Sequence, residues 1–202
     1  MSESTHKKTN RLVVGITGAS GVVYGKRILE IAGQAGIETH LVVSKAAEMT
    51  IRYELDEPVA TLHELASHYY AVRDIGATIS SGSFQHLGMV IAPCSVKTMS
   101  EIATGVTTNL ISRAADVTLK ERRPLILMVR ETPFHLGHLR TMTALTEMGA
   151  IIAPPLPSFY IEPKSVDELV DQSAGRVFDL LGIETTVTKR WGEDLEKGAR
   201  KT

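Results

Sequence analysis

The sequence has 202 residues, with 22 basic and 23 acidic side chains and a formal net charge of −1. This balance argues against a nucleic-acid-binding surface, and no apolar run reaches the roughly 18 residues needed to cross a membrane. A hydrophobic content of 43% is enough for a sizeable core, and the length suits one domain. The single cysteine, Cys94, excludes a disulfide within the chain and suits a reducing, cytoplasmic location.

The polar segment 1–10 is predicted to be a disordered leader and the charged segment 184–202 a tail, which leaves 11–183 as one domain. The leader lacks the apolar core of a signal peptide. No Cys/His cluster has the spacing of zinc ligands, so we expect no metal site. His135 and His138 lie three residues apart, and a solvated helix start explains them better than a metal.

Apolar runs that predict strands alternate along the domain with amphipathic runs that predict helices. The strands are expected at 12–16, 39–43, 89–92, 125–129 and 150–153. The helices are expected at 22–35, 45–55, 61–70, 96–103, 110–120, 137–148 and 165–181. Continuous Val/Ile/Leu strands alternating with helices are typical of a parallel sheet covered on both faces. We therefore predict a three-layer α/β/α domain, Rossmann-like or flavodoxin-like.

The first predicted strand ends in Thr17-Gly18-Ala19-Ser20-Gly21, a tight turn that leads into a helix. Free N–H groups at a helix N-terminus bind anions, and glycines let the backbone approach a ligand closely. The turn could therefore hold a phosphate or a flavin. It could equally be an ordinary strand-to-helix turn with Ser20 as its N-cap, because a short glycine motif does not separate the two interpretations.

Polar groups also follow three other predicted strands, at Ser44, at 94–98, and at Arg130 with Glu131. The carboxyl ends of parallel strands meet at one edge of a sheet, where ligands bind. Four polar strand ends together therefore predict a ligand site at that edge. Cys94 has no base nearby in sequence, so we expect a buried thiol rather than a nucleophile.

Several charged side chains have both a structural and a functional interpretation. Arg113, Asp116 and Lys120 lie on one side of a predicted helix, as a surface ion ladder or as two cations that converge on a phosphate. Glu54 follows a helix and Glu131 follows a strand. Either could be a solvated carboxylate, and the strand-end position favours Glu131 as a proton donor or acceptor.

Three more residues call for a partner. Tyr160 lies in a Pro-rich loop, and Arg176 lies near the apolar stripe of the last predicted helix, where a cation needs a counter-charge. Trp191 is the only tryptophan and lies in the charged tail. An exposed indole is unusual, so we expect Trp191 to dock on the domain, on a ligand or on another subunit.

The chain resembles the flavin prenyltransferases of the UbiX type, formerly called aromatic-acid carboxy-lyases, from about residue 11 to 191. Six segments carry the resemblance: 15–21, 43–47, 91–98, 113–124, 129–133 and 158–160. It implies a homo-oligomer, usually a dodecamer, with the flavin between subunits. The implied reaction joins a dimethylallyl group from dimethylallyl phosphate to N5 and C6 of reduced FMN. The prenylated FMN would serve a separate UbiD-type decarboxylase.

The resemblance also implies roles for single residues. FMN would be held by Gly18, Ala19, Ser20, Ser44, Ser95, Val96, Lys97, Thr98 and Arg130. Dimethylallyl phosphate would be held by Arg113, Lys120, Tyr160 and Arg176, with Trp191 lining the prenyl site. Ser20, Glu54 and Glu131 would handle protons. No metal is implied, because cations and a phenol stabilise a leaving phosphate and no Asp-rich magnesium motif is present.

Two departures from the family and two alternative functions stay open at this point. Phe84 lies in a loop where some relatives carry Trp, and Lys97 replaces a smaller residue and is expected to point away from the flavin. One alternative is an FMN-dependent oxidative decarboxylase of cysteine-type substrates. Those proteins carry a Pro-x-Met-Asn segment where this chain has 130–134. The other alternative is a non-catalytic flavin-binding subunit of an aromatic-acid decarboxylase.

Overall fold

A parallel sheet of six strands runs through the middle of the chain in the order β3-β2-β1-β4-β5-β6. The computed structural model describes residues 10–190. The strands are β1 (Arg11–Ile16), β2 (Glu38–Val43), β3 (His68–Tyr70), β4 (Gly88–Cys94), β5 (Leu125–Val129) and β6 (Ile151–Ile152). The helices are α1 (Val22–Gln34), α2 (Lys45–Glu54), α3 (Val59–Leu65), α4 (Val96–Ala103), α5 (Leu110–Lys120), α6 (Leu136–Glu147) and α7 (Val166–Leu180). Two 3-10 turns, η1 (Thr78–Ser80) and η2 (Phe159–Ile161), complete the described elements.

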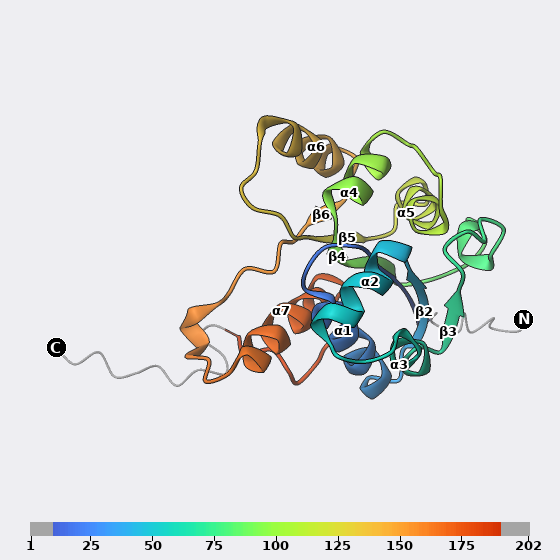
Figure 1. Cartoon of the computed structure of the whole chain (residues 1–202). Helices are drawn as coiled ribbons and strands as arrows, with labels where there is room; N and C mark the ends of the chain where they lie inside the picture. Colours follow the sequence, from blue (N-terminus) through green and yellow to red (C-terminus); the bar gives the residue numbers. More distant parts are fainter. Residues whose placement is uncertain (1–9, 191–202) are drawn as a thin grey trace, which may run out of the picture.

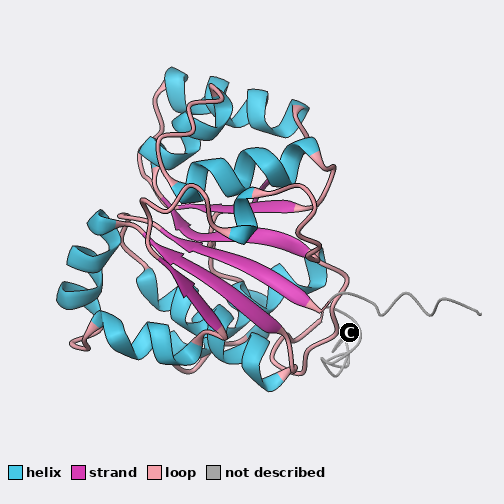
Figure 2. Ribbon diagram, turned by 90° about the vertical axis from the view of Figure 1, so that its right-hand side faces the viewer, coloured by secondary structure: helices cyan, strands magenta, loops and turns pink. Residues whose placement is uncertain are grey.

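Helices cover both faces of the sheet (Figures 1 and 2). Helices α1, α2, α3 and α7 lie on one face, and α4, α5 and α6 lie on the other. Alternate residues of β1 point to opposite faces of the sheet. Val14 and Ile16 pack in the core beneath α1 and α7, and Val13 packs in the core beneath α4 and α5. Burial on both faces explains the continuous apolar strands of the sequence, and the predicted three-layer α/β/α fold is confirmed.

The predicted helix at 61–70 is wrong in its second half. Helix α3 ends at Leu65, and His68–Tyr70 forms the edge strand β3 beside β2. The change of structure occurs at Ser67, whose N–H donates to Thr39 Oγ1 while its Oγ accepts from the Thr39 N–H, each at 3.0 Å. This contact across 28 residues outweighs local helix propensity, which is a weak prior.

Other boundaries agree with the sequence pattern to within two residues. Helices α4 and α5 have the predicted bounds, whereas β4 runs through Pro93 to Cys94. Helix α7 begins after Ser165, whose Oγ accepts from the Glu168 N–H at 3.2 Å. Glu168 returns a bond to the N–H of Lys164 at 3.2 Å, one residue before the position that a capping box requires.

The chain after α7 turns back along that helix. The side-chain amide of Gln172 donates to the Lys189 carbonyl and its oxygen accepts from the Lys189 N–H, each at 3.0 Å. Thr188 is buried against Gly175. The proposed division at 183/184 stays a prediction, and segments 1–9 and 191–202, with Trp191, lie outside the described residues. Over residues 10–190, no helix is both long and apolar enough to span a membrane.

Two glycines of α1 provide a matched test of packing. A Cβ at Gly25 would overlap the Ala92 carbonyl oxygen and reach 2.8 Å from Ile16 Cδ1, whereas a Cβ at Gly33 meets nothing within 4 Å. We expect Gly25→Ala to lower the free energy of unfolding by about 1–3 kcal/mol. Gly33→Ala should raise it by about 0.4–1 kcal/mol. Denaturant unfolding of both variants measures these changes, and equal effects would contradict the packing of α1 on β4.

Candidate functional site

A cavity of about 570 Å³ lies beyond the carboxyl ends of β1, β2, β4 and β5. The nine residues that the sequence resemblance assigns to FMN all lie on its wall, together with Glu131. The full lining is Gly18, Ala19, Ser20, Ser44, Lys45, Ala46, Val72, Ser95, Val96, Lys97, Thr98, Asn109, Ile111, Arg130 and Glu131. The parallel sheet thus brings together segments that lie more than a hundred residues apart in sequence.

Thr17 joins the turn that follows β1 to the turn that follows β4. Its hydroxyl donates to the Pro93 carbonyl at 2.7 Å and accepts from the Ser95 N–H at 2.8 Å, in a position only 1% exposed. The Thr17 hydroxyl is therefore used for contacts inside the protein. Gly18, next in the chain, lies so close to Ala46 that a Cβ there would overlap that residue's Cβ.

The start of α1 differs from the interpretation of the sequence that makes Ser20 its N-cap. The N-cap is Gly21, with φ of 97°, and Ser20 makes no capping bond. The N–H groups of Gly21 and Val22 donate to Glu54 Oε2 at 2.8 and 3.1 Å. A carboxylate of the protein itself therefore occupies this helix N-terminus, where its charge is favourable. Glu54 is not on the wall of the cavity.

Two other helix N-termini point their first turns at the cavity. Ser44 caps α2 by accepting from the Ala47 N–H at 3.1 Å, and Ser95 caps α4 by accepting from the Thr98 N–H at 3.3 Å. The Ser95 hydroxyl also donates to Thr98 Oγ1 at 3.2 Å. The remaining first-turn N–H groups and the helix dipoles favour an anion in this space.

Arg130 and Glu131 close the cavity on the β5 side with different contacts. Arg130 Nε donates to the Ser20 carbonyl at 3.2 Å, which ties the β5 end to the first turn. Glu131 Oε1 accepts from the Thr132 N–H at 2.9 Å. Each side chain keeps polar atoms available for a ligand, one as a cation and one as a carboxylate.

Cys94 lies at the end of β4, beside the cavity but outside its wall. It is fully buried, and burial raises the pKa of its thiol to about 12. A thiol in this state is almost entirely protonated at neutral pH and is a poor nucleophile. The expectation of a buried strand-end thiol is confirmed.

Of the residues assigned to dimethylallyl phosphate, two lie on α5. Arg113 Nη1 pairs with Asp116 Oδ2 at 2.8 Å, and Lys120 pairs with Glu121. Lys120 and Asp116 line a separate hollow beside the C-terminal end of α4. One pair of the predicted ion ladder, Arg113–Asp116, is therefore present, whereas Lys120 pairs with Glu121 instead of Asp116. Neither cation is on the wall of the cavity at the strand ends.

The other two assigned residues lie on the far side of the sheet. Tyr160 in η2 accepts from Gln172 Nε2 at 3.2 Å, and Arg176 on α7 pairs with Asp179 at 3.5 Å. Both line a hollow between α7 and the segment that follows β6. Within one chain the α5 pair and the α7 pair do not meet.

Five residues of the cavity wall were not assigned a role from the sequence: Val72, Asn109 and Ile111, and Lys45 and Ala46 at the start of α2. Asn109 caps α5 and forms a capping box with Ser112. The position of Asn109 just before an amphipathic helix was a signal that the sequence contains. The apolar residues Val72 and Ile111 gave no such signal. Phe84 lies elsewhere, in edge-to-face contact with His40 at 4.8 Å between centroids, and Lys97 pairs with Glu101 at 2.6 Å on the rim of the cavity.

Comparison with known proteins gives consistent relatives. Residues 1–178 match the family described as Flavoprotein. The chain is 51% identical to the flavin prenyltransferase UbiX of Thauera aromatica, over 95% of this chain and 99% of that protein. A UbiX protein solved with FMN and dimethylallyl pyrophosphate matches with TM-score 0.90 and 46% identity, covering 91% of this chain and 98% of that one. A dodecameric FMN-dependent UbiX-like decarboxylase from Escherichia coli O157:H7 matches with TM-score 0.87 and 43% identity, covering 90% and 98%.

The Thr17 bridge can be tested without changing the volume of the side chain. Thr17→Val removes the hydroxyl and leaves the Ser95 N–H buried without its acceptor. We expect the free energy of unfolding to fall by about 1–3 kcal/mol. Thr141→Val is the control, because the Thr141 hydroxyl only bonds back to the Gly137 carbonyl on the exposed side of α6. Denaturation curves that show equal small effects for both variants would contradict a bridging role.

Proposed function

The chain belongs to the flavoprotein family and, within it, to the UbiX flavin prenyltransferases, and we propose on this premise how its residues act. The reaction joins a dimethylallyl group to reduced FMN, and a UbiD-type decarboxylase uses the prenylated product. One observation carries the assignment of the flavin site. All nine residues expected to hold FMN line a single cavity at the carboxyl ends of the strands.

The cavity suits FMN in its hydrogen-bond donors and its charge. Gly18 has no side chain, which lets its turn pack against Ala46 on the cavity wall. The N-termini of α2 and α4, with Ser44 and Ser95, offer hydrogen-bond donors for one phosphate, and Arg130 adds a cation. The sequence has no Gly-x-Gly-x-x-Gly turn for a pyrophosphate after β1. When bound, reduced FMN supplies the nucleophilic N5 and C6 atoms.

The prenyl donor requires a cationic site for its phosphate. Arg113, Lys120 and Arg176 supply positive charge and Tyr160 a phenol, which together stabilise a leaving phosphate without a metal ion. In one chain Lys120 on α5 and Arg176 on α7 line different hollows. We therefore place the donor site between copies of the chain in a homo-oligomer. A dodecameric relative of similar structure supports this arrangement.

Glu131 is the residue that we assign to proton transfer at the flavin. It lies on the cavity wall beside Arg130 and has one contact to the backbone N–H of Thr132. Loss of the donor phosphate creates a proton acceptor, and bond formation at C6 requires that a proton leave. A carboxyl group within reach serves either transfer. Ser20 and Glu54 are the two further proton carriers that we propose, and Glu54 also holds the start of α1.

We also propose that the transfer needs no metal ion and that the protein is cytoplasmic. The first proposal follows from the cationic residues assigned to the phosphate. The second follows from a single cysteine, which is buried and cannot form a disulfide within the chain. Phe84 packs on His40 rather than on the flavin cavity, so we do not assign it to the prenyl site.

Glu131→Gln tests the proton transfer. The amide keeps the shape and hydrogen bonding of the side chain but cannot carry a proton. We expect unchanged FMN affinity and a fall of about 10²–10⁴-fold in prenylation rate. Anaerobic single-turnover absorbance with reduced FMN and dimethylallyl phosphate gives the rate, and mass spectrometry identifies the prenylated flavin. Glu147→Gln, on the exposed end of α6, is the control. A wild-type rate for Glu131→Gln would exclude this role.

Mixed oligomers test whether the donor site is shared between chains. Arg113→Ala and Arg176→Ala should each be inactive alone. If α5 and α7 residues of one site come from different chains, random mixing at equal amounts restores about a quarter of the sites. Activity is measured on oligomers formed by co-expression.

The control mixes Arg113→Ala with Lys120→Ala, two changes on the same helix. Every α5 in that mixture is defective, so we expect no recovery. Failure of the first mixture to exceed the control would contradict a shared donor site.

A further inference from the structure

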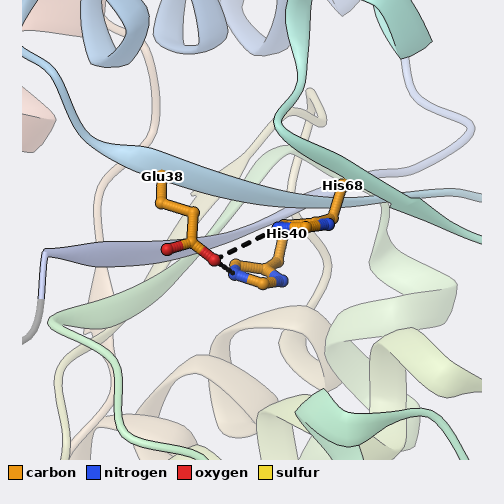
Figure 3. Close-up of side chains that lie close together, drawn as sticks. All are labelled: Glu38, His40 and His68. Carbon is orange, nitrogen blue, oxygen red and sulfur yellow. Dashed lines mark hydrogen bonds and ion pairs between the residues drawn. The ribbon is translucent and has the colours of Figure 1, made fainter.

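A second cluster of chemical groups lies at the other end of the sheet from the flavin cavity. Glu38 and His40 lie at the amino end of β2, and His68 begins β3 (Figure 3). Residues two apart on a strand share a face, and His40 pairs directly with His68 in the parallel register. The three side chains therefore converge on one face, although 28 residues separate His40 from His68.

The distances between these side chains suit a small cation. Glu38 Oε1 lies 3.0 Å from His40 Nε2 and 3.2 Å from His68 Nε2. The ligand atoms of all three lie within 4.8 Å of one another. A tetrahedral Zn²⁺ with bonds of about 2.0–2.1 Å places its ligand atoms about 3.3–3.5 Å apart. An ion can therefore enter with small side-chain shifts.

The mobile member of the set is His68. The two imidazole rings are stacked, with centroids 4.7 Å apart and planes 21° apart, so one ring must turn before both lone pairs meet at one point. His40 is 3% exposed and held from several sides, whereas the His68 side chain is 51% exposed and has more room to turn. The exposed side also leaves a coordination position for water.

Hydrogen bonds to neighbouring residues already orient His40 and Glu38. His40 Nδ1 lies 2.9 Å from Tyr70 Oη, which lies 3.2 Å from Thr78 Oγ1. The Tyr70 hydroxyl can accept a hydrogen bond from the Nδ1–H of His40. This leaves Nε2 unprotonated as a ligand, an arrangement that is common for metal-binding histidines. Arg11 Nε donates to Glu38 Oε2 at 3.3 Å, which leaves Oε1 directed at the two histidines.

We propose that Glu38, His40 and His68 form a binding site for one divalent transition-metal ion, with Zn²⁺ the best match. Two imidazoles and one carboxylate are a common zinc ligand set. Within residues 10–190, no other group of three such side chains comes together in this way. The ion would tie the three-residue edge strand β3 to β2. Four residues after His68, Val72 lines the flavin cavity and accepts from the Leu110 N–H at 2.8 Å.

The charge of Arg11 limits which ions bind. A guanidinium beside the carboxylate opposes a hard cation that depends on charge alone, such as Mg²⁺ or Ca²⁺, and those ions prefer oxygen ligands. Imidazole ligands favour Zn²⁺, Co²⁺ or Ni²⁺. The site therefore differs from a negatively charged surface, which attracts any cation. Comparing the binding of different metal ions tests this difference.

The test uses the tag-free full chain, treated with EDTA and then dialysed free of it. Isothermal titration with Zn²⁺ should give one ion per chain. At Zn²⁺ about 100-fold above the dissociation constant, Tm should rise by about 5–10 °C, and equal concentrations of Mg²⁺ or Ca²⁺ should leave it unchanged. Binding of no Zn²⁺, or an equal response to Mg²⁺, would overturn the proposal.

Three variants locate the ion. His68→Gln and Glu38→Gln should lose the Zn²⁺-dependent rise in Tm. His68 lies on an exposed edge, so metal-free His68→Gln should unfold within about 2 °C of the metal-free parent. His138→Gln changes the His135–His138 pair, whose ring centroids are 3.6 Å apart, and should keep the full rise. A full rise in both site variants, or its loss only in His138→Gln, would assign the ion to another place.

Discussion

The hydroxyl of Thr17 is the contact on which the flavin site depends. It donates to the carbonyl of Pro93 and accepts from the N–H of Ser95, so the turns after β1 and β4 are held at a fixed separation. Both bonds are buried, where a lost partner is costly. Arg130 adds a third turn by its bond to the Ser20 carbonyl. The Ser44 N–H donates to the Ile16 carbonyl at 2.9 Å, so all four strand ends around the cavity are connected by hydrogen bonds before any ligand arrives.

The two ends of the parallel sheet have different chemistry. At the carboxyl end, helix N-termini, hydroxyls and Arg130 make a site for an anion. At the amino end, Glu38, His40 and His68 make the site that we propose for a cation. Strand polarity is the common cause, because in a parallel sheet all carboxyl ends lie on one edge and all amino ends on the other. A metal ion at the amino end of the sheet is compatible with a prenyl transfer that requires no metal ion.

The proposed donor residues are divided between two hollows, which agrees with a donor site shared between copies of the chain. One chain supplies a cavity lined by all nine residues assigned to FMN, but Lys120 on α5 and Arg176 on α7 line different hollows. A phosphate held by both sets needs a second copy of the chain. The ion pairs Arg113–Asp116 and Arg176–Asp179 are partly exposed. Partly exposed pairs are weakly bound, so they can exchange partners at low cost.

The sequence alone determined the layers, the strand direction and most of the residues on the wall of the cavity at the strand ends. Continuous apolar strands require cover on both faces, and polar groups at four strand ends must meet once those strands run parallel. Tertiary structure decided what depends on long-range pairing. The edge strand β3 exists because Ser67 exchanges bonds with Thr39, and His68 meets His40 only through that strand. Local pattern carries no information on such a partner, since the energy that favours it comes from residues far away in the chain.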